Sequence, residues 1–323
     1  MPLRILFMGT PAFAQVQLQA LYTQAARQDW EIVGVVCQPD KPCARGNRTL
    51  PCAVKAYAQS LALPILQPQT LRDDAFMRDL SAAAPELIVV AAYGKLLPQQ
   101  VLTYPRLGCI NVHGSLLPHF RGAAPIQRAI MQGEEKTGVT IMYMEQGLDT
   151  GAILAQSAFP ITLQDTYGTV HDRMAAVGAA LLTEVIPSLR DGTARPIPQE
   201  NDLASYAPKI EKEECRLDFS QSAAMLACKI RALSPAPLAA AFLQTKQGVR
   251  RIKIVDARAV ETSKTAPFGT VLSACNGSIT VRCGNGALEL LRLKPDGKAE
   301  MDAAAFINGR QIATGDRFMQ AEG

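Results

Sequence analysis

The sequence predicts a two-domain α/β protein, in which a mostly parallel sheet flanked by helices is followed by a small β-barrel. The chain has 323 residues, which is more than a single domain usually holds. Short apolar runs alternate with segments of helical spacing over residues 1–190. Closely spaced strand-like runs, joined by Gly and Asn turns, then occupy much of residues 208–318.

Apolar, partly β-branched runs bounded by Gly or Pro predict the strands of the first domain. They cover residues 4–8, 31–36, 87–91 and 109–113. Helical spacing predicts helices over residues 13–26, 73–83 and 166–189. Continuous apolar strands separated by helices are typical of a parallel sheet buried on both faces, so we expect a Rossmann-like domain. The dinucleotide fingerprint G-x-G-x-x-G does not follow the first strand, which argues against a bound dinucleotide.

A polar, Pro-containing segment at residues 191–207 is expected to be a linker between the two domains. The second domain begins with a helix predicted at residues 222–233. Its strand-like runs cover residues 249–259, 269–274, 278–283 and 287–293. Several short strands at this spacing predict an OB-like barrel. The net charge is +4, and its basic excess lies entirely from Ala207 onward, which favours an anionic partner such as nucleic acid.

The sequence favours a cytoplasmic protein without a membrane segment. The longest apolar stretches, such as residues 86–93, are far too short to cross a bilayer. The N-terminus runs straight into a strand-like segment and shows no cleavage-site pattern. The eight cysteines form no C-x-x-C pair and no Cys/His cluster, so we expect reduced thiols and no bound metal.

The densest cluster of polar residues follows the strand predicted at residues 109–113. Alternate side chains of a strand share a face, so Asn111 and His113 point the same way. Gly114 and Pro118 force a turn, which places both side chains at the carboxyl end of the strand, where open sheets bind ligands. Asn can donate to a developing oxyanion, and His can give or take a proton. The alternative is a turn-capping Asn and a structural His, and their pairing at a strand end favours the chemical interpretation.

A second cluster surrounds Asp149 in the Gly-flanked segment at residues 144–151. A carboxylate in such a loop could orient a neighbouring histidine and favour its charged form. Spacing alone does not bring Asp149 to His113, and a role in an Asx-turn is the alternative.

Four motifs lie in and around these clusters. They are Asn-x-His at 111–113, Ser-Leu-Leu-Pro at 115–118, Arg-Gly at 121–122 and Leu-Asp-Thr-Gly at 148–151. Together they resemble the signature of the folate-dependent formyltransferases. Other segments resemble the branch of that family that acts on methionyl-tRNA, at residues 7–14, 38–42, 44–46, 122–128, 138–142 and 206–210. The likeness covers almost the whole chain.

The resemblance implies a reaction and a set of site residues. The formyl group of 10-formyltetrahydrofolate would move to the α-amino group of methionyl-initiator tRNA, with Asn111, His113 and Asp149 as the catalytic set. Arg121 is either a cation near the folate or a solvated surface residue. Core packing is an equal alternative for the leucines of the implied folate set, which comprises Ile88, Ala91, Tyr93, Ser115, Leu116, Leu117, Pro118 and Gly147.

Contacts with tRNA are implied for a loop at residues 38–55, in which Arg45 occupies the arginine position of the family, and for the second domain. Cationic side chains on a loop can contact phosphates or bases, although a solvated loop is the alternative. Ala236 stands where a Trp is expected, which puts any stacking at that position in doubt. The resembled enzymes act as monomers, so we expect a monomer. The implied tRNA-binding residues are Lys41, Arg45, Arg48 and Lys209.

Three other functions stay open at this point. They are formyl transfer to another amine (glycinamide ribonucleotide or a nucleotide sugar), hydrolysis of formyltetrahydrofolate, and tRNA binding without catalysis. The expected barrel domain and the Arg45 loop argue against the glycinamide enzyme, and a nucleotide-sugar enzyme would carry a longer second half with a dinucleotide motif. The basic second domain argues against the hydrolase. The intact set of Asn111, His113 and Asp149 argues against a noncatalytic protein.

Overall fold

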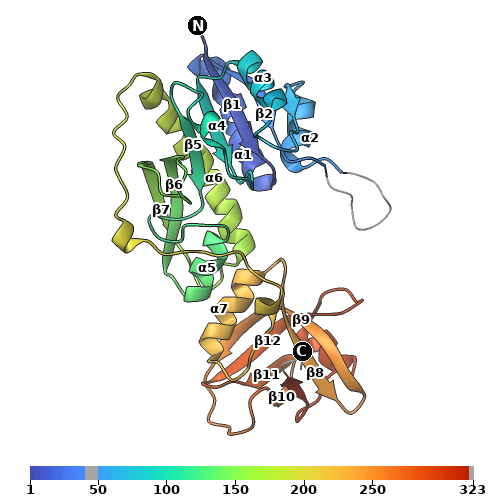
Figure 1. Cartoon of the computed structure of the whole chain (residues 1–323). Coiled ribbons are helices and arrows are strands. Elements are labelled where there is room, and N and C mark those ends of the chain that lie inside the picture. The colour runs from blue at the N-terminus through green and yellow to red at the C-terminus, as the bar shows by residue number, and fades with distance from the viewer. Residues whose placement is uncertain (41–49, 320–323) are drawn as a thin grey trace. The chain divides into compact units, whose positions relative to one another are not determined.

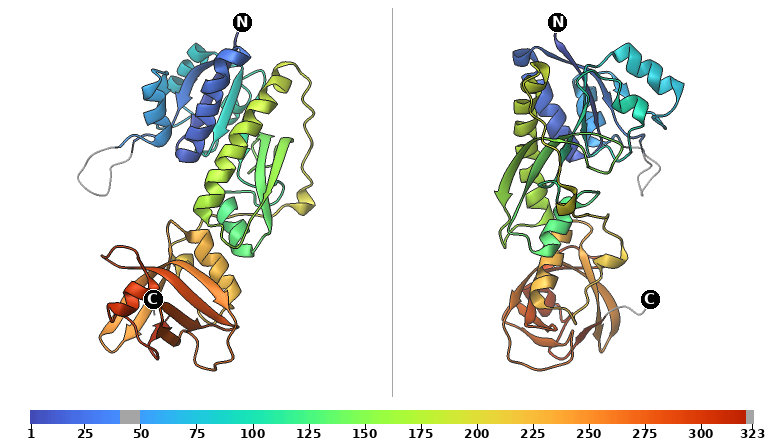
Figure 2. Two further views of the ribbon diagram at one scale, coloured as in Figure 1. Left: turned by 180° about the vertical axis from the view of Figure 1, so that it is seen from behind. Right: turned by 60° about the vertical axis from the view of Figure 1, so that its left-hand side comes forward.

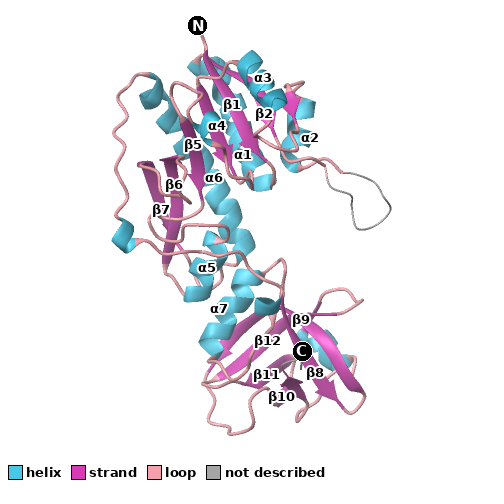
Figure 3. Cartoon of the chain, viewed as in Figure 1, coloured by secondary structure: helices cyan, strands magenta, loops and turns pink. Residues whose placement is uncertain are grey.

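The computed structural model of the chain describes residues 1–40 and 50–319 (Figure 1). The chain forms two compact units, each built from several segments. The first comprises Met1–Gly122, Lys136–Phe159 and His171–Ala207, and the second comprises Ala123–Glu135, Pro160–Val170 and Pro208–Gly323. Figure 3 shows helices alternating with strands in the first unit and a predominance of strands in the second.

A seven-stranded sheet forms the centre of the first unit. Its first five strands in spatial order are parallel to their neighbours, and the sixth is antiparallel to the fifth. This arrangement confirms the predicted, mostly parallel sheet. In spatial order the strands are β3 (Ile65–Leu66), β2 (Trp30–Val36), β1 (Leu3–Gly9), β4 (Leu87–Ala91), β5 (Cys109–His113), β6 (Lys136–Tyr143) and β7 (Ile153–Pro160).

Helices cover both faces of this sheet, as the continuous apolar strands require. On one face, Leu6 and Met8 of β1 pack with α3 and α4 in a buried apolar cluster. The side chains of Ile5 and Phe7 alternate to the other face, where α1 and α6 lie side by side (Figure 2). The helices of the first unit are α1 (Ala12–Gln28), α2 (Ala53–Ser60), α3 (Asp74–Ala83), α4 (Gln99–Leu102) and α6 (Tyr167–Arg190).

A close approach of α6 to β5 determines which face of β5 is available for a site. A Cβ atom on Gly178 would lie 3.0 Å from Val112 and 3.3 Å from Val139, so this position brings the helix tightly onto the strands. Val112 therefore faces α6. Asn111 and His113, which alternate with it, face the other way.

The second unit contains a six-strand antiparallel path in the order β10-β11-β12-β9-β8-β14, with β13 beside β12. A bridge between Thr270 and Arg317 connects the two ends of that path, so the sheet curls into a barrel, consistent with the OB-like prediction. The strands are β8 (Ala239–Thr245), β9 (Gly248–Val260), β10 (Val271–Cys275), β11 (Ser278–Arg282), β12 (Ala287–Pro295), β13 (Met301–Asp302) and β14 (Arg317–Met319).

Helices close the apolar interior of this barrel. Leu226 and Ile230 of α7 and Phe306 of α8 are fully buried in one cluster with the inward-facing strand residues. The helices of the second unit are α5 (Pro125–Gln132), α7 (Ala223–Leu233) and α8 (Ala303–Asn308), and short 3₁₀ turns cover Asn201–Leu203 in the first unit and Glu213–Cys215 in the second. Within the described residues no helix is both long and apolar enough to span a bilayer. The residue boundaries of the two domains stay a prediction.

Candidate active site

Strand β5 places two polar side chains in the middle of the first sheet. It lies between β4, where Val90 pairs with Asn111, and β6, where Thr140 pairs with His113. Asn111 and His113 share the face turned away from α6. The amide of Asn111 makes no hydrogen bond with any described residue, so its N–H groups are available to a ligand.

The imidazole of His113 is held between a backbone carbonyl and a carboxylate. His113 is only 5% exposed, and its Nε2 lies 3.0 Å from the carbonyl oxygen of Phe120. A carbonyl oxygen only accepts, so Nε2 carries a proton and donates it to Phe120. The other ring nitrogen, Nδ1, faces Oδ2 of Asp149 at 3.6 Å, within ion-pair range but longer than a hydrogen bond. Nδ1 is therefore the ring nitrogen without a hydrogen-bond partner among the described residues.

Asp149 comes from the loop between β6 and β7. Its φ of 51° lies in the left-handed region, which Asp tolerates better than most residues. The carboxylate oxygen Oδ2 accepts a hydrogen bond of 2.8 Å from the backbone N–H of Gly122. The structure thus brings Asp149 to His113, which sequence spacing alone could not establish.

The buried hydroxyl of Thr140 restrains the turn after β5. The family resemblance implies that this turn contacts the folate. Thr140 Oγ1 donates to the carbonyl of Ser115 at 2.7 Å and accepts from the N–H of Leu117 at 3.1 Å. Gln156 Nε2 donates to the carbonyl of Leu117 at 2.8 Å and to Thr140 Oγ1 at 2.9 Å. These bonds restrain the turn and occupy the carbonyls of Ser115 and Leu117 and the N–H of Leu117.

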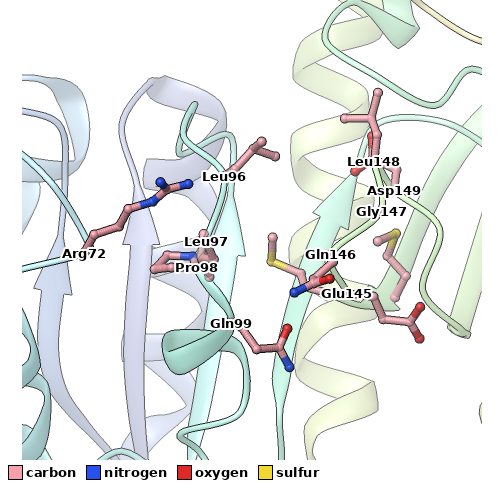
Figure 4. A pocket seen from close by; sticks show the side chains of 12 residues that line it. Arg72, Leu96, Leu97, Pro98, Gln99, Glu145, Gln146, Gly147, Leu148 and Asp149 are labelled. Atoms are coloured by element: carbon pink, nitrogen blue, oxygen red, sulfur yellow. The ribbon is translucent and has the colours of Figure 1, made fainter.

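A cavity of about 490 Å³ lies beside this strand end (Figure 4). Met142, one of its lining residues, pairs directly with Asn111 across β5 and β6. Two loops form its opposite walls in Figure 4, one following β4 and the other following β6. The lining residues are Arg72, Leu96, Leu97, Pro98, Gln99, Met142, Met144, Glu145, Gln146, Gly147, Leu148 and Asp149.

One residue of the expected folate set lines this cavity, and the others do not. Gly147 is part of its lining. Five others are buried and do not line it, namely Ile88, Ala91, Tyr93, Ser115 and Leu117. Leu116 and Pro118 are half-buried. Burial raises the pKa of Tyr93 to about 12, so its phenol stays neutral.

Most of the lining was not predicted from the sequence. Residues 96–99 come a few residues after the predicted strand β4, which ends at Ala91, and Met142, Met144, Glu145 and Gln146 come shortly before the Gly147–Asp149 motif. For residues 96–99 the position after a predicted parallel strand was the available signal, because loops at the carboxyl ends of parallel strands form ligand sites. The residues from Met142 onward belong to or follow β6, which is antiparallel to β5, so only their nearness to the motif in the sequence pointed to them. Arg72 lies far from any motif and offered no such signal.

Arg121 is neither a surface residue nor a lining residue of this cavity. It is only 2% exposed, and its guanidinium donates to Gln199 Oε1 from Nε at 3.1 Å and from Nη2 at 2.8 Å. Nη2 also donates to Asn201 Oδ1 at 3.0 Å. Both partners come from the segment that the sequence predicted to be a linker.

Of the residues predicted to contact tRNA, only Lys209 lies within the described part of the chain. Lys41, Arg45 and Arg48 lie outside the described residues. Lys209 is exposed, and its carbonyl accepts a hydrogen bond of 3.1 Å from Arg128. Ala236 is exposed as well. Over residues 1–40 and 50–319, His, Cys, Asp and Glu side chains form no group of three or more that could hold a metal ion.

Comparison with known families covers both parts of the chain. The family described as Formyl transferase matches residues 3–186, and the family described as Formyl transferase, C-terminal domain, matches residues 209–311. The chain therefore belongs to the formyl transferase family. A methionyl-tRNA formyltransferase of Pseudomonas entomophila (strain L48) is 44% identical over 318 residues, which is 98% of this chain and 99% of that protein.

Solved structures share the fold at much lower identity. HypX from Aquifex aeolicus, in complex with tetrahydrofolic acid, aligns with a TM-score of 0.64 at 20% identity, and the alignment covers 95% of this chain and 47% of HypX. This chain thus spans about half the length of HypX. An N-formyltransferase from Helicobacter canadensis, in complex with folinic acid and dTDP-3-aminofucose, aligns with a TM-score of 0.61 at 16% identity, covering 89% of this chain and 98% of that one.

Proposed function

We propose that this chain transfers the formyl group of 10-formyltetrahydrofolate to the α-amino group of methionyl-initiator tRNA, giving N-formylmethionyl-tRNA for translation initiation. One observation carries the proposal: 44% identity extends over 98% of the chain to a methionyl-tRNA formyltransferase. The match includes the second domain, so it is not limited to a catalytic core that formyltransferases with other acceptors could share.

The cavity beside β5 is the proposed site of the folate. Its volume of about 490 Å³ is suited to a ligand of folate's size, and both apolar and polar side chains line it. HypX, which shares the fold, was crystallised with tetrahydrofolic acid. Gly147 lines this cavity directly, and the other predicted folate residues would act by shaping its wall: Ile88, Ala91, Tyr93, Ser115, Leu116, Leu117 and Pro118.

The catalytic residues are proposed to be Asn111, His113 and Asp149. The attacking α-amine must be neutral, and its ordinary pKa of about 8 leaves much of it protonated at neutral pH. Attack on the formyl carbon forms a C–N bond and a tetrahedral intermediate with a negatively charged oxygen. The free N–H groups of Asn111 are available to donate to that oxygen.

His113 would handle a proton through Nδ1, since Nε2 is already committed to Phe120. A proton on Nδ1 points toward the carboxylate of Asp149 at 3.6 Å, so that carboxylate compensates a positive imidazole. Collapse of the intermediate breaks the bond between the formyl carbon and the folate nitrogen, and that nitrogen takes up a proton as it leaves. The attacking nitrogen, which becomes positively charged on addition, must lose a proton. We propose that His113, beside Asp149, takes up that proton and that a proton is returned from it to the leaving folate nitrogen.

The acceptor would be bound by residues outside the cavity. We place the catalytic domain at residues 1–190, the linker at 191–207 and a tRNA-binding OB-like domain at 208–318. Contacts to the acceptor are proposed for Lys41, Arg45, Arg48 and the exposed Lys209. We further propose that the protein works as a monomer in the cytoplasm.

The test is an acceptor comparison with purified protein and 10-formyltetrahydrofolate labelled in the formyl group. Methionyl-initiator tRNA, methionyl-elongator tRNA, glycinamide ribonucleotide and water alone serve as acceptors. We expect label on the methionyl amine of initiator tRNA. Label that appears only as formate would identify a hydrolase, label on glycinamide ribonucleotide would identify a different transferase, and label that stays on folate would rule out catalysis of this kind.

A further inference from the structure

Residues 197–207 of the first unit form hydrogen bonds both to the loop that carries Asp149 and to the turn that follows β5. Near its start, Ile197 exchanges two backbone hydrogen bonds of 2.8 Å with Ile153, close to the loop that carries Asp149. Near its end, the carbonyl of Ser205 accepts from the N–H of Arg121 at 2.8 Å. We call residues 197–207 the strap.

Gln199 of the strap holds the backbone on both sides of Thr150. Its Nε2 donates to the carbonyl of Asp149 at 2.9 Å and to the carbonyl of Gly151 at 2.7 Å, which uses both N–H groups of the amide. The four residues before Asp149 are exposed, and Asp149 has a positive φ, a conformation that persists only where its surroundings hold it. Gln199 supplies such a restraint directly at that residue.

Arg121 fixes the orientation of the Gln199 amide. Two guanidinium N–H groups donate to Gln199 Oε1. A rotation of the amide by half a turn would place its NH₂ group opposite these two donors, so the guanidinium fixes the orientation of the amide. Among the described residues, the hydrogen-bond partners of this buried guanidinium are the neutral amides of Gln199 and Asn201. An arginine at 2% exposure without a carboxylate partner is costly, which argues for a role beyond stability.

The strap also fixes the backbone that anchors His113. Ser205 Oγ accepts from the N–H of Phe120 at 2.9 Å, and it is the carbonyl of Phe120 that accepts from His113 Nε2. The N–H of Ala207 donates to the carbonyl of Arg121 at 2.7 Å. One segment therefore restrains both the partner of Nε2 and the loop whose carboxylate faces Nδ1.

We propose that Gln199, oriented by Arg121, is a positioning residue that sets the distance between Asp149 and His113 in the formyl transfer reaction. The inference rests on the proposed function for its kinetic consequences, but the geometry it describes can be measured independently of turnover. Gln199 does not line the cavity, so it acts through the Asp149 loop and not through contact with folate.

A double-mutant cycle separates this role from general stabilisation. Gln199→Leu removes both donors. We expect kcat to fall roughly tenfold to a hundredfold with little change in the KM for folate, because moving a catalytic group by about 1 Å can lower the rate by that much. Combined with Asp149→Asn, the same change should cost less than about twofold, since residues that act through one another are not additive. Equal losses in both backgrounds would overturn the positioning role.

Two further variants serve as controls. Gln199→Glu keeps an acceptor for Arg121 but loses the donors to the two carbonyls, so it should fold and lose kcat like Gln199→Leu. Gln17→Leu removes an amide that is more deeply buried than Gln199 and also donates to two carbonyls, those of Phe13 and Ala175, on the other face of the sheet. It should lower stability without lowering kcat. A loss of kcat in Gln17→Leu equal to that in Gln199→Leu would mean that both losses reflect general destabilisation and would overturn the positioning role.

NMR of the histidine rings tests the geometry without any turnover. The chain has 3 histidines, so the His113 ring signals can be assigned with a single variant. We expect Gln199→Leu to move these signals in the same direction as Asp149→Asn, and Gln17→Leu to leave them in place. Unchanged His113 signals in Gln199→Leu would overturn the inference, whereas a wild-type protein that transfers no formyl group would overturn only the proposed function.

Discussion

The Nδ1 atom of His113 lies 3.6 Å from Oδ2 of Asp149, while Nε2 of the same ring lies 3.0 Å from the carbonyl of Phe120. The two nitrogens therefore have separate tasks. Nε2 fixes the ring plane by donating to the backbone, and Nδ1 stays free of a hydrogen bond beside a carboxylate, as the proposed proton transfer requires. Asp149 is itself restrained by the N–H of Gly122, which follows closely on the Phe120 carbonyl in the chain. Hydrogen bonds to the backbone of Phe120 and Gly122, two residues apart in the chain, thus help to position both His113 and Asp149.

Substitution of His113 should remove chemistry without removing ligand binding. We expect His113→Ala to lower kcat by roughly a hundredfold to ten-thousandfold, the usual range for loss of a general acid or base. His113 does not line the cavity, so the folate dissociation constant should change by less than about twofold. Single-turnover kinetics and folate binding by fluorescence provide the two measurements. A parallel loss of folate affinity would point to a collapsed cavity instead.

Asn111 offers a test of oxyanion stabilisation. Its side-chain amide has no hydrogen-bond partner among the described residues, so removing it breaks no internal hydrogen bond and should change stability little. We expect Asn111→Ala to lower kcat by roughly a hundredfold to a thousandfold, as for loss of one oxyanion donor. Asn111→Asp should be at least as slow, because a carboxylate would repel the oxyanion. An active Asn111→Asp variant would remove this residue from the catalytic set.

Much of the fold could be predicted because its strands are apolar throughout. β4 and β5 begin and end where the sequence predicted. β1 extends one residue further at each end, and β2 begins one residue earlier. β8 was missed because its start, Ala239-Ala-Ala, lacks the β-branched residues that indicate a strand. β7 was missed for a different reason. Its residues are half-buried or exposed, so it carries no apolar run.

The candidate site was predictable only where chemistry and strand geometry coincide. Asn111 and His113 could be found because the alternation of a strand puts them on one face. Asp149 could not be connected to His113 without the family resemblance, because a loop has no period from which its path follows. The strap was interpreted as a linker because Pro and polar residues are typical of linkers. Its Gln199 makes contacts with residues far apart in the sequence, which composition does not reveal.

The loop that carries Asp149 should not tolerate a side chain at position 151. A Cβ atom on Gly151 would lie 2.0 Å from the carbonyl oxygen of Tyr143, and backbone cannot move aside as a flexible side chain can. We expect Gly151→Ala to displace the loop and to lower kcat about tenfold or more. Gly192→Ala is the matched control, since its φ is +67° but no atom lies within 4 Å of the added Cβ. The control should cost about 1 kcal/mol of stability and leave kcat intact.

Selection of tRNA can be tested separately from catalysis. We expect Arg45→Ala to raise KM for methionyl-initiator tRNA while leaving KM for folate unchanged, because the family resemblance gives this residue a contact with the acceptor. Steady-state kinetics with each substrate varied in turn would measure both constants. The KM for tRNA of the wild-type protein should rise with salt, as for any contact with phosphates, and less steeply in the variant. Unaltered tRNA kinetics would remove Arg45 from the acceptor site.

An ion pair in the second unit should make its stability depend on acidic pH. Glu214 accepts from Arg128 Nη1 at 2.7 Å and Nη2 at 3.0 Å, and these bonds, with the N–H of Glu211, lower its pKa from 4.5 to about 2. A carboxyl whose pKa is lower in the folded state contributes stability above its unfolded value. That contribution is lost as pH falls from about 4.5 toward about 2, where both states become protonated.

Glu214→Gln should therefore be less stable than the wild type at neutral pH and should approach it in acid. The side chain is 38% exposed, so we expect a difference of no more than about 1 kcal/mol at neutral pH. Urea unfolding of both proteins at a series of pH values measures it. Glu213→Gln is the control, because Glu213 forms no ion pair in the described part of the chain and lies in the same 3₁₀ turn. A difference between Glu214→Gln and wild type that stayed constant down to pH of about 3 would show that the variant acts through packing and not through the charge on Glu214.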